Sequence, residues 1–161
     1  MRSGPWAPTS FSERDDPAPG EDRAPRLPTC DPDRVSVDAA SGEVTALDHV
    51  QLAMPPGGEE KAEAFYSGVL GIPRVPKPEP LAARGGCWFE RGELRVHVGV
   101  EEDFRPARKA HPALAVAGLG ALIQSLEAAG VTVTPGDGID GMEQAYVDDP
   151  FGNRIELIER D

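Results

Sequence analysis

Apolar and polar residues alternate along the stretch TALDHVQLAM. Val50, Leu52 and Met54 fall on one face of the expected strand, and His49 and Gln51 fall on the opposite face. A period of two residues is typical of a strand that places one face against a core. The PPGG turn that follows ends this strand.

The period then changes to that of a helix. In EEKAEAFYSGVLG the apolar residues recur at i, i+3, i+4, i+7 and i+8 from Ala62, and Gly71 provides a stop. A proline-punctuated segment (72–80), a short strand around GCWFE and the strand ELRVHVGV come next. In the last of these, Arg95 and His97 face away from the alternating leucine and valines.

The same order of elements returns after the polar linker EEDFRPARK. HPALAV is expected as a strand, AGLGALIQSLEAAG as a helix, and VTVT, MEQAYVDD and NRIELIE as three further strands. Such a repeat of strand, helix and three strands predicts an α+β fold built from two βαβββ modules. Landmarks about 60 residues apart support the duplication: His49 and His111 in the first strands, Gly71 and Gly130 at the helix ends, and His97 and Glu156 in the last strands.

The repeat sets the expected domain boundaries. Residues 1–44 are rich in Pro, Asp, Arg and Gly and poor in large aliphatic residues, so they cannot offset their ordering entropy by burial. This segment is predicted to be a disordered extension. The domain then spans 45–161, with a first module at 45–101, a linker at 102–110 and a second module at 111–160.

Charge and composition narrow the possible partners. A formal net charge of -12 disfavours nucleic acid, whose phosphates would be repelled. No apolar run is long enough to cross a bilayer and no signal peptide is visible, so a cytoplasmic protein without a membrane partner is expected. The two cysteines, Cys30 and Cys87, have no zinc-ligand spacing and are not expected to form a disulfide, and Cys87 is expected to be a small buried residue.

Four potential metal ligands, including every histidine of the chain, occupy the expected strands: His49, His97, His111 and Glu156. Their apolar neighbours must face the helices, so the four side chains face the other side of the sheets. If the modules pair and curl, these faces meet around one cavity. Each residue alone is an ordinary strand residue more often than a ligand. Together they favour a site for iron, manganese, zinc or nickel, since two histidines and a carboxylate leave positions open for substrate or water.

The motifs LDHVQLAM with AEAFYSGVLG, HPALAV with LEAAGV, and YVDDPFGNRIELIE resemble, in this order, the vicinal oxygen chelate superfamily. That superfamily includes glyoxalase I, extradiol dioxygenases, bleomycin-resistance proteins, fosfomycin-modifying enzymes and methylmalonyl-CoA epimerase. The resemblance spans residues 46–159. It implies paired βαβββ modules that form an open, cupped mixed sheet around one divalent metal ion. It also implies a substrate that is chelated through oxygen and activated by Lewis acidity.

The resemblance also assigns roles. His49, His111 and Glu156 match the two-histidine, one-carboxylate set of many members. His97 stands where glyoxalase I-like members have a glutamate that serves as ligand and base. His97 is therefore either a fourth ligand or an acid/base group, and His97 and Glu156 are the candidate catalytic residues.

Further residues are candidates for substrate binding. Arg95 shares a face with His97 and either holds a carboxylate or phosphate or makes a cross-strand charge pair. Arg105 and Arg108 either catch an anionic substrate at the rim or belong to a solvated linker. Three more side chains are expected to line the pocket: Gln51, Trp88 and Tyr146.

The expected function is a metal-dependent lyase, isomerase or dioxygenase that acts on a small oxygenated substrate, either anionic or neutral. In many small members of the superfamily the pocket forms between modules of different subunits, so the resemblance implies a homodimer. Two alternatives remain open: a bleomycin-resistance-type protein that sequesters a ligand without turnover, and a metal-free structural or regulatory member.

Overall fold

The computed structural model describes residues 42–138 and 141–160. The chain divides into two compact units, Met1–Val44 and Thr45–Asp161, and only the second contains helices and strands among these residues. The predicted disordered extension at 1–44 lies almost entirely outside the described residues, as does Cys30.

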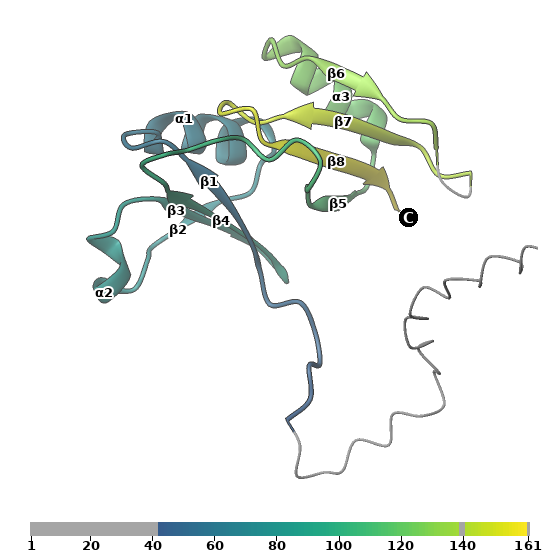
Figure 1. The fold of residues 1–161 in the computed structure, drawn as a ribbon. Helices are drawn as coiled ribbons and strands as arrows, with labels where there is room; N and C mark the ends of the chain where they lie inside the picture. Colours follow the sequence, from purple (N-terminus) through teal and green to yellow (C-terminus); the bar gives the residue numbers. More distant parts are fainter. Residues whose placement is uncertain (1–41, 139–140, 161) are drawn as a thin grey trace, which may run out of the picture. The chain divides into compact units, whose positions relative to one another are not determined.

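Eight strands form two four-stranded sheets (Figure 1). The strand order is β1-β4-β3-β2 in the first sheet and β5-β8-β7-β6 in the second, so the two halves of the domain have the same topology. The α+β fold of two βαβββ-like modules is thus confirmed. The strands are β1 (Val50–Met54), β2 (Arg74–Val75), β3 (Cys87–Arg91), β4 (Leu94–Val100), β5 (Ala113–Val116), β6 (Val133–Pro135), β7 (Gln144–Asp148) and β8 (Arg154–Glu159).

Strand pairing repeats together with the topology. In each sheet the first and last strands of the module pair in parallel, and the remaining pairs are antiparallel. Gln51 lies opposite His97 in the first sheet, and Ala113 lies opposite Glu156 in the second. β1 and β5 are edge strands of the two sheets, and among the described residues neither has a strand partner on its outer side.

The first helix differs from the prediction. An α-helix, α1 (Glu59–Glu63), continues as a π-helix, η2 (Ala64–Val69), in which the Leu70 amide bonds the Phe65 carbonyl. The apolar periodicity could not reveal this change, because a π-helical segment of six residues is too short to show a period of its own. The second expected helix is α3 (Leu119–Ala128), and a short helix not expected from the sequence, α2 (Glu79–Ala82), precedes β3.

Both expected glycine stops are present. Gly71 and Gly130 follow the helices with φ of 67° and 78°, values at which a residue with a Cβ is strained. At the start of α3, two backbone amides that have no acceptor within the helix donate to a residue distant in the sequence. The Glu159 carboxylate accepts hydrogen bonds from the amides of Gly118 and Leu119, which ties the helix to β8.

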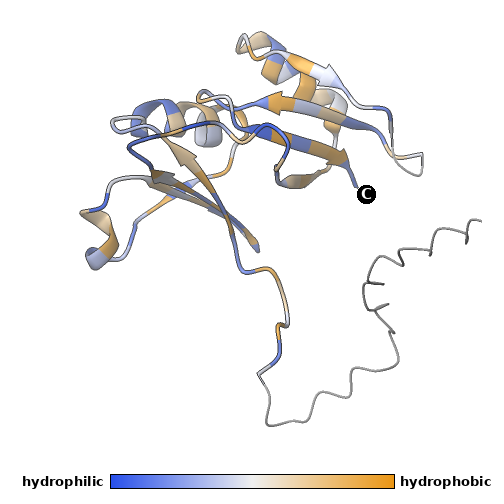
Figure 2. Ribbon diagram, in the orientation of Figure 1, coloured by the Kyte–Doolittle hydropathy of each residue, from blue (hydrophilic) through white to orange (hydrophobic). Residues whose placement is uncertain are grey.

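Buried apolar side chains from both modules form one core. The buried cluster contains Phe65, Phe89 and Val98 from the first module and Leu126 and Leu157 from the second. Figure 2 shows hydrophobic residues on the strands and on the helices, whereas the long segment between β4 and β5 is mostly hydrophilic. Cys87 is buried and free, as expected of a small apolar residue. No helix among the described residues is long and apolar enough to cross a membrane.

A buried carboxylate connects the two modules. Asp149, in the turn between β7 and β8, is 4% exposed and accepts four hydrogen bonds. The Tyr66 hydroxyl donates to Oδ2 at 2.9 Å, as does the Asn153 side-chain amide at 2.8 Å. The backbone amides of Phe151 and Asn153 donate to Oδ1, each at 2.9 Å. Asn153 also donates to the Ala53 carbonyl of β1 at 2.8 Å.

These hydrogen bonds stabilise the fold because each oxygen of the buried Asp149 carboxylate accepts two of them. Burial, with the neighbouring Asp149 charge, raises the pKa of Tyr66 far above its usual value, so Tyr66 stays a hydrogen-bond donor. The DPFGN turn therefore holds η2 and β1 against the second module.

Replacing Tyr66 with Phe should lower the free energy of unfolding by about 1.5–3 kcal/mol, because one hydrogen bond to a buried carboxylate is lost while the ring stays. Chemical denaturation measures this change. A matched control is Ser125→Ala, which removes an exposed hydroxyl that bonds the carbonyl one turn back in α3, and it should change stability by less than about 0.5 kcal/mol. Equal effects of the two variants would contradict the importance of the Asp149 network.

Candidate functional site

The first sheet carries a pocket of about 490 Å³ beside β1, β3 and β4. Three of the residues predicted to bind substrate, Gln51, Trp88 and Arg95, line it together with His49 and His97. The other lining residues are Asp48, Leu81 and Glu90. Gly99 of β4 leaves room for the side chain of Gln51 on β1. A Cβ at position 99 would lie 3.2 Å from the side-chain nitrogen Nε2 of Gln51.

Three aromatic rings stack in this pocket. The His97 ring lies between Trp88, at a centroid distance of 4.1 Å and an interplanar angle of 5°, and His49, at 4.2 Å and 28°. Trp88 is the cross-strand partner of His97, which explains why the two side chains share a face. The stack fixes the plane of the His97 ring.

The hydrogen bonding of the two histidines differs. His97 is only 7% exposed, and its Nε2 has no partner among the described residues. Burial, together with the charge of His49, lowers the pKa of His97 below its usual value. His49 is more exposed, and its Nδ1 lies 2.8 Å from Asp48 Oδ1. Since a carboxylate only accepts, Nδ1 carries the hydrogen and a neutral His49 has a free lone pair on Nε2.

The second sheet holds the other two predicted ligands. His111 lies two residues before β5, and its Nε2 lies 3.2 Å from Oε2 of Glu156 in β8. The Tyr146 hydroxyl of β7 donates to Glu156 Oε1 at 3.3 Å, and the His111 ring meets the edge of the Tyr146 ring. Partial burial and the Glu156 charge raise the pKa of Tyr146. Glu156 itself is 7% exposed, so it is not a solvated charge on an edge strand.

The two nitrogens of His111 both face oxygen atoms. Nδ1 lies 2.7 Å from the Lys109 carbonyl, which can only accept, so this nitrogen carries a hydrogen. Nε2 then points a lone pair at Glu156 unless the ring is protonated, the carboxyl is protonated, or a cation stands between them. The pair is thus suited to share a positive ion.

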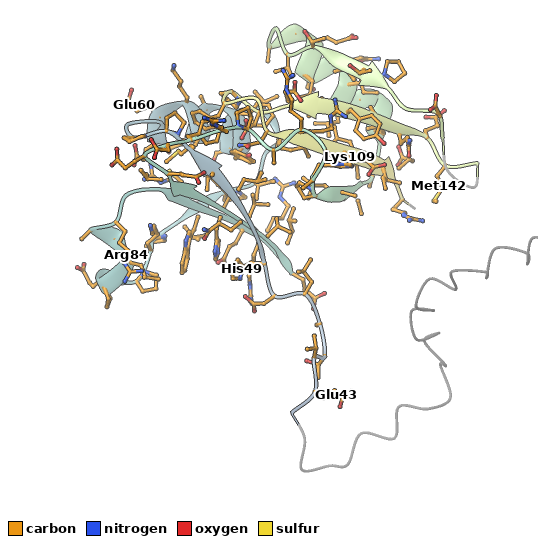
Figure 3. All side chains as sticks on the ribbon, in the orientation of Figure 1. Glu43, His49, Glu60, Arg84, Lys109 and Met142 are labelled. Atoms are coloured by element: carbon orange, nitrogen blue, oxygen red, sulfur yellow. The ribbon has the colours of Figure 1, made fainter. Side chains whose placement is uncertain are left out.

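The structure brings the four predicted ligands together as two pairs. His49 with His97 belongs to the first sheet, and His111 with Glu156 belongs to the second. Figure 3 shows His49 beside β1, whereas Lys109, the hydrogen-bond partner of His111, lies near β8. Within residues 42–138 and 141–160, no three His, Cys, Asp or Glu side chains are grouped closely enough to hold a metal ion.

The predicted arginines occupy different environments. Arg95 lines the pocket, and its NH1 donates to Asp48 Oδ2 at 2.6 Å. Arg105 and Arg108 are exposed in the loop between β4 and β5, and neither lines the pocket of the first sheet. Tyr146 belongs to the second sheet, where it contacts Glu156.

Sequence reasoning missed two polar residues of the site. Asp48 contacts both His49 and Arg95, although neighbours along a strand point to opposite faces. It can do so because β1 begins only at Val50. Gln144 donates to the Tyr146 hydroxyl at 3.5 Å, and its buried Oε1 lacks a partner among the described residues. Its position two residues before Tyr146 on the same strand face was the available signal.

Comparison with known proteins agrees with this architecture. Residues 46–157 match the Glyoxalase/Bleomycin resistance protein/Dioxygenase superfamily. A solved structure of a glyoxalase family protein from Bacillus anthracis is 44% identical, with a TM-score of 0.71, over 75% of this chain and 99% of that protein. The chain therefore belongs to this superfamily. A comparison with curated proteins finds no match.

More distant structures share the fold alone. The fosfomycin resistance protein FosX from Listeria monocytogenes is 15% identical with a TM-score of 0.60, over 74% of this chain and 96% of that protein. The lactoylglutathione lyase from Agrobacterium tumefaciens is 19% identical with a TM-score of 0.58, over 73% of this chain and 96% of that protein.

In metal-free protein, His97 should titrate below the ordinary histidine pKa of about 6.5. NMR titration in the presence of a chelator measures this. Trp88→Ala, which admits water to the ring, should move the pKa back toward 6.5, whereas Trp88→Phe should largely keep the wild-type value.

The same shift has a consequence for stability. The unfolded chain binds a proton at His97 at a higher pH than the folded chain does. The contribution of neutral His97 to the free energy of unfolding is therefore fully present above a pH of about 6.5. It is lost as the pH falls toward the lower pKa of His97 in the folded protein. A His97 pKa at or above 6.5 in the metal-free protein would contradict the burial of this ring.

Proposed function

We propose that this protein is a divalent-metal-dependent enzyme of the superfamily that acts on a small oxygenated substrate. Its metal site combines His49 of one subunit with His111 and Glu156 of a second subunit, and His97 beside His49 is either a fourth ligand or an acid/base group. The observation that carries the proposal is the His111–Glu156 pair. Nδ1 of His111 donates to the Lys109 carbonyl, and Nε2 of the same ring lies 3.2 Å from the buried Glu156 carboxylate.

The donor set fits a divalent first-row metal ion. Imidazole nitrogens and a carboxylate suit zinc, iron, manganese or nickel. His49 and His111 each have one nitrogen held by an oxygen acceptor, the usual way in which a protein orients a metal-binding imidazole. The buried, unpartnered Nε2 of His97 supports the same reading, since buried polar atoms normally have a partner.

A second subunit is part of the proposal because one chain supplies two incomplete pairs. The two sheets share no strand pairing, and the described residues hold no cluster of three ligands. Each pair lies on a sheet whose first strand is an edge strand among the described residues. A two-fold dimer would place the first sheet of one subunit against the second sheet of the other and form two identical sites.

When bound, the metal would act as a Lewis acid on a chelated substrate oxygen. The residues of the chain then have separate tasks. His97, whose lowered pKa keeps it neutral near pH 7, can accept a proton at Nε2, while Trp88 keeps its ring in place. If His97 instead ligates the ion, Glu156 is the remaining proton acceptor, and the Tyr146 hydroxyl holds its other oxygen.

A complementation experiment tests both the metal and the shared site. One variant carries His49→Ala and His97→Ala, and the other carries His111→Ala and Glu156→Gln. Each alone should bind no stoichiometric zinc, manganese or nickel. After unfolding and refolding together in equal amounts, roughly a quarter of the sites should bind metal, because half of randomly paired dimers contain one intact site of two.

The alternatives give different results. Metal binding by wild type without recovery in the mixture would place all ligands in one chain and contradict the shared site. Absence of metal from wild type purified without a histidine tag and then supplied with each ion would refute the metalloenzyme proposal. That outcome would leave the ligand-sequestering or structural member.

A further inference from the structure

Three charged or polar groups form a continuous hydrogen-bonded chain at the edge of the first pocket. Arg95 NH1 donates to Asp48 Oδ2 at 2.6 Å, and His49 Nδ1 donates to Asp48 Oδ1 at 2.8 Å. Each oxygen of the carboxylate thus has its own partner.

The arrangement leaves Arg95 poorly placed to bind an anionic substrate. Its guanidinium is already paired with Asp48, and its cross-strand neighbour Glu90 lines the same pocket. Two carboxylates therefore accompany one arginine. An anion that approached Arg95 would meet the negative charges of Asp48 and Glu90.

The chain of contacts gives Arg95 a different task. Asp48 is well exposed, at 71% for its side chain, and precedes β1, so neither burial nor the sheet fixes its orientation. Arg95 belongs to β4 and pairs with Glu90 of β3, so the sheet anchors its backbone. It can therefore hold one carboxylate oxygen so that the other faces His49.

We infer that Arg95 is a positioning residue that acts through Asp48 to fix His49 in the tautomer with hydrogen on Nδ1 and a free lone pair on Nε2. An exposed pair of this kind adds little to stability, so its value is the orientation of the imidazole. The link from this tautomer to metal affinity rests on the proposed function. The tautomer itself does not.

The first measurement is the tautomer of His49 in metal-free protein. Nitrogen-15 NMR at a pH well above the ordinary histidine pKa of about 6.5 reads which ring nitrogen carries the hydrogen. The chain has only three histidines, so a His49→Ala variant assigns the signal. Wild type should show hydrogen on Nδ1, whereas Asp48→Ala and Arg95→Met should show a mixture of the two tautomers. Arg95→Lys should recover part of the wild-type pattern, since it restores the charge without the planar donor group.

The second measurement is the dissociation constant of zinc or cobalt for the full chain. Asp48→Ala should weaken binding by about 10- to 100-fold and Arg95→Met by about 10-fold, the range typical of residues that orient a metal ligand. The matched control is Arg74→Met, because Arg74 also forms an exposed ion pair on this sheet, with Glu63 at 2.5 Å. This control should change binding less than about twofold.

The outcomes separate the two ideas. If Arg95→Met leaves the His49 tautomer as in wild type, the inference is wrong. If the tautomer changes as expected but wild type binds no metal, the positioning role stands and the proposed function fails. If metal affinity falls while the tautomer stays fixed, Arg95 acts on the site by charge alone, and the inference is likewise overturned.

Discussion

The carboxylate of Asp149 is the contact on which the rest of the domain depends. It lies in the turn between β7 and β8, yet it accepts hydrogen bonds from Tyr66 of η2 and from Asn153, which in turn bonds β1. A buried carboxylate is costly unless each acceptor position is filled, so the turn can occupy only one place relative to the first module. The position of β8, and with it Glu156, follows from this turn.

The same architecture gives the two halves of the site different chemical characters. The first sheet presents stacked aromatic rings, with a buried histidine between Trp88 and His49. The second sheet presents an oxygen-rich group in which Tyr146 and His111 both contact Glu156. A duplicated fold thus carries two unlike surfaces at equivalent positions. In the proposed shared site, the first module of one chain would meet the second module of another.

Local patterns in the sequence predicted most of the fold. The apolar alternation of β1, β4 and β8 and the glycines at 71 and 130 are short-range features, and the structure confirms them. The π turns of η2 and the short helix α2 were not predicted. The six residues of η2 and the four residues of α2 are too few to show a period of their own.

The sequence by itself determined the duplicated modules, the membership in the superfamily and the sheet faces that carry His97 and Glu156, because these depend on periodicity and on motif order. Only the tertiary structure decided that the four candidate ligands form two separate pairs, since strand order within each sheet sets which side chains meet. It also decided that Arg95 bonds Asp48, because a contact across 47 positions depends on the register between β1 and β4.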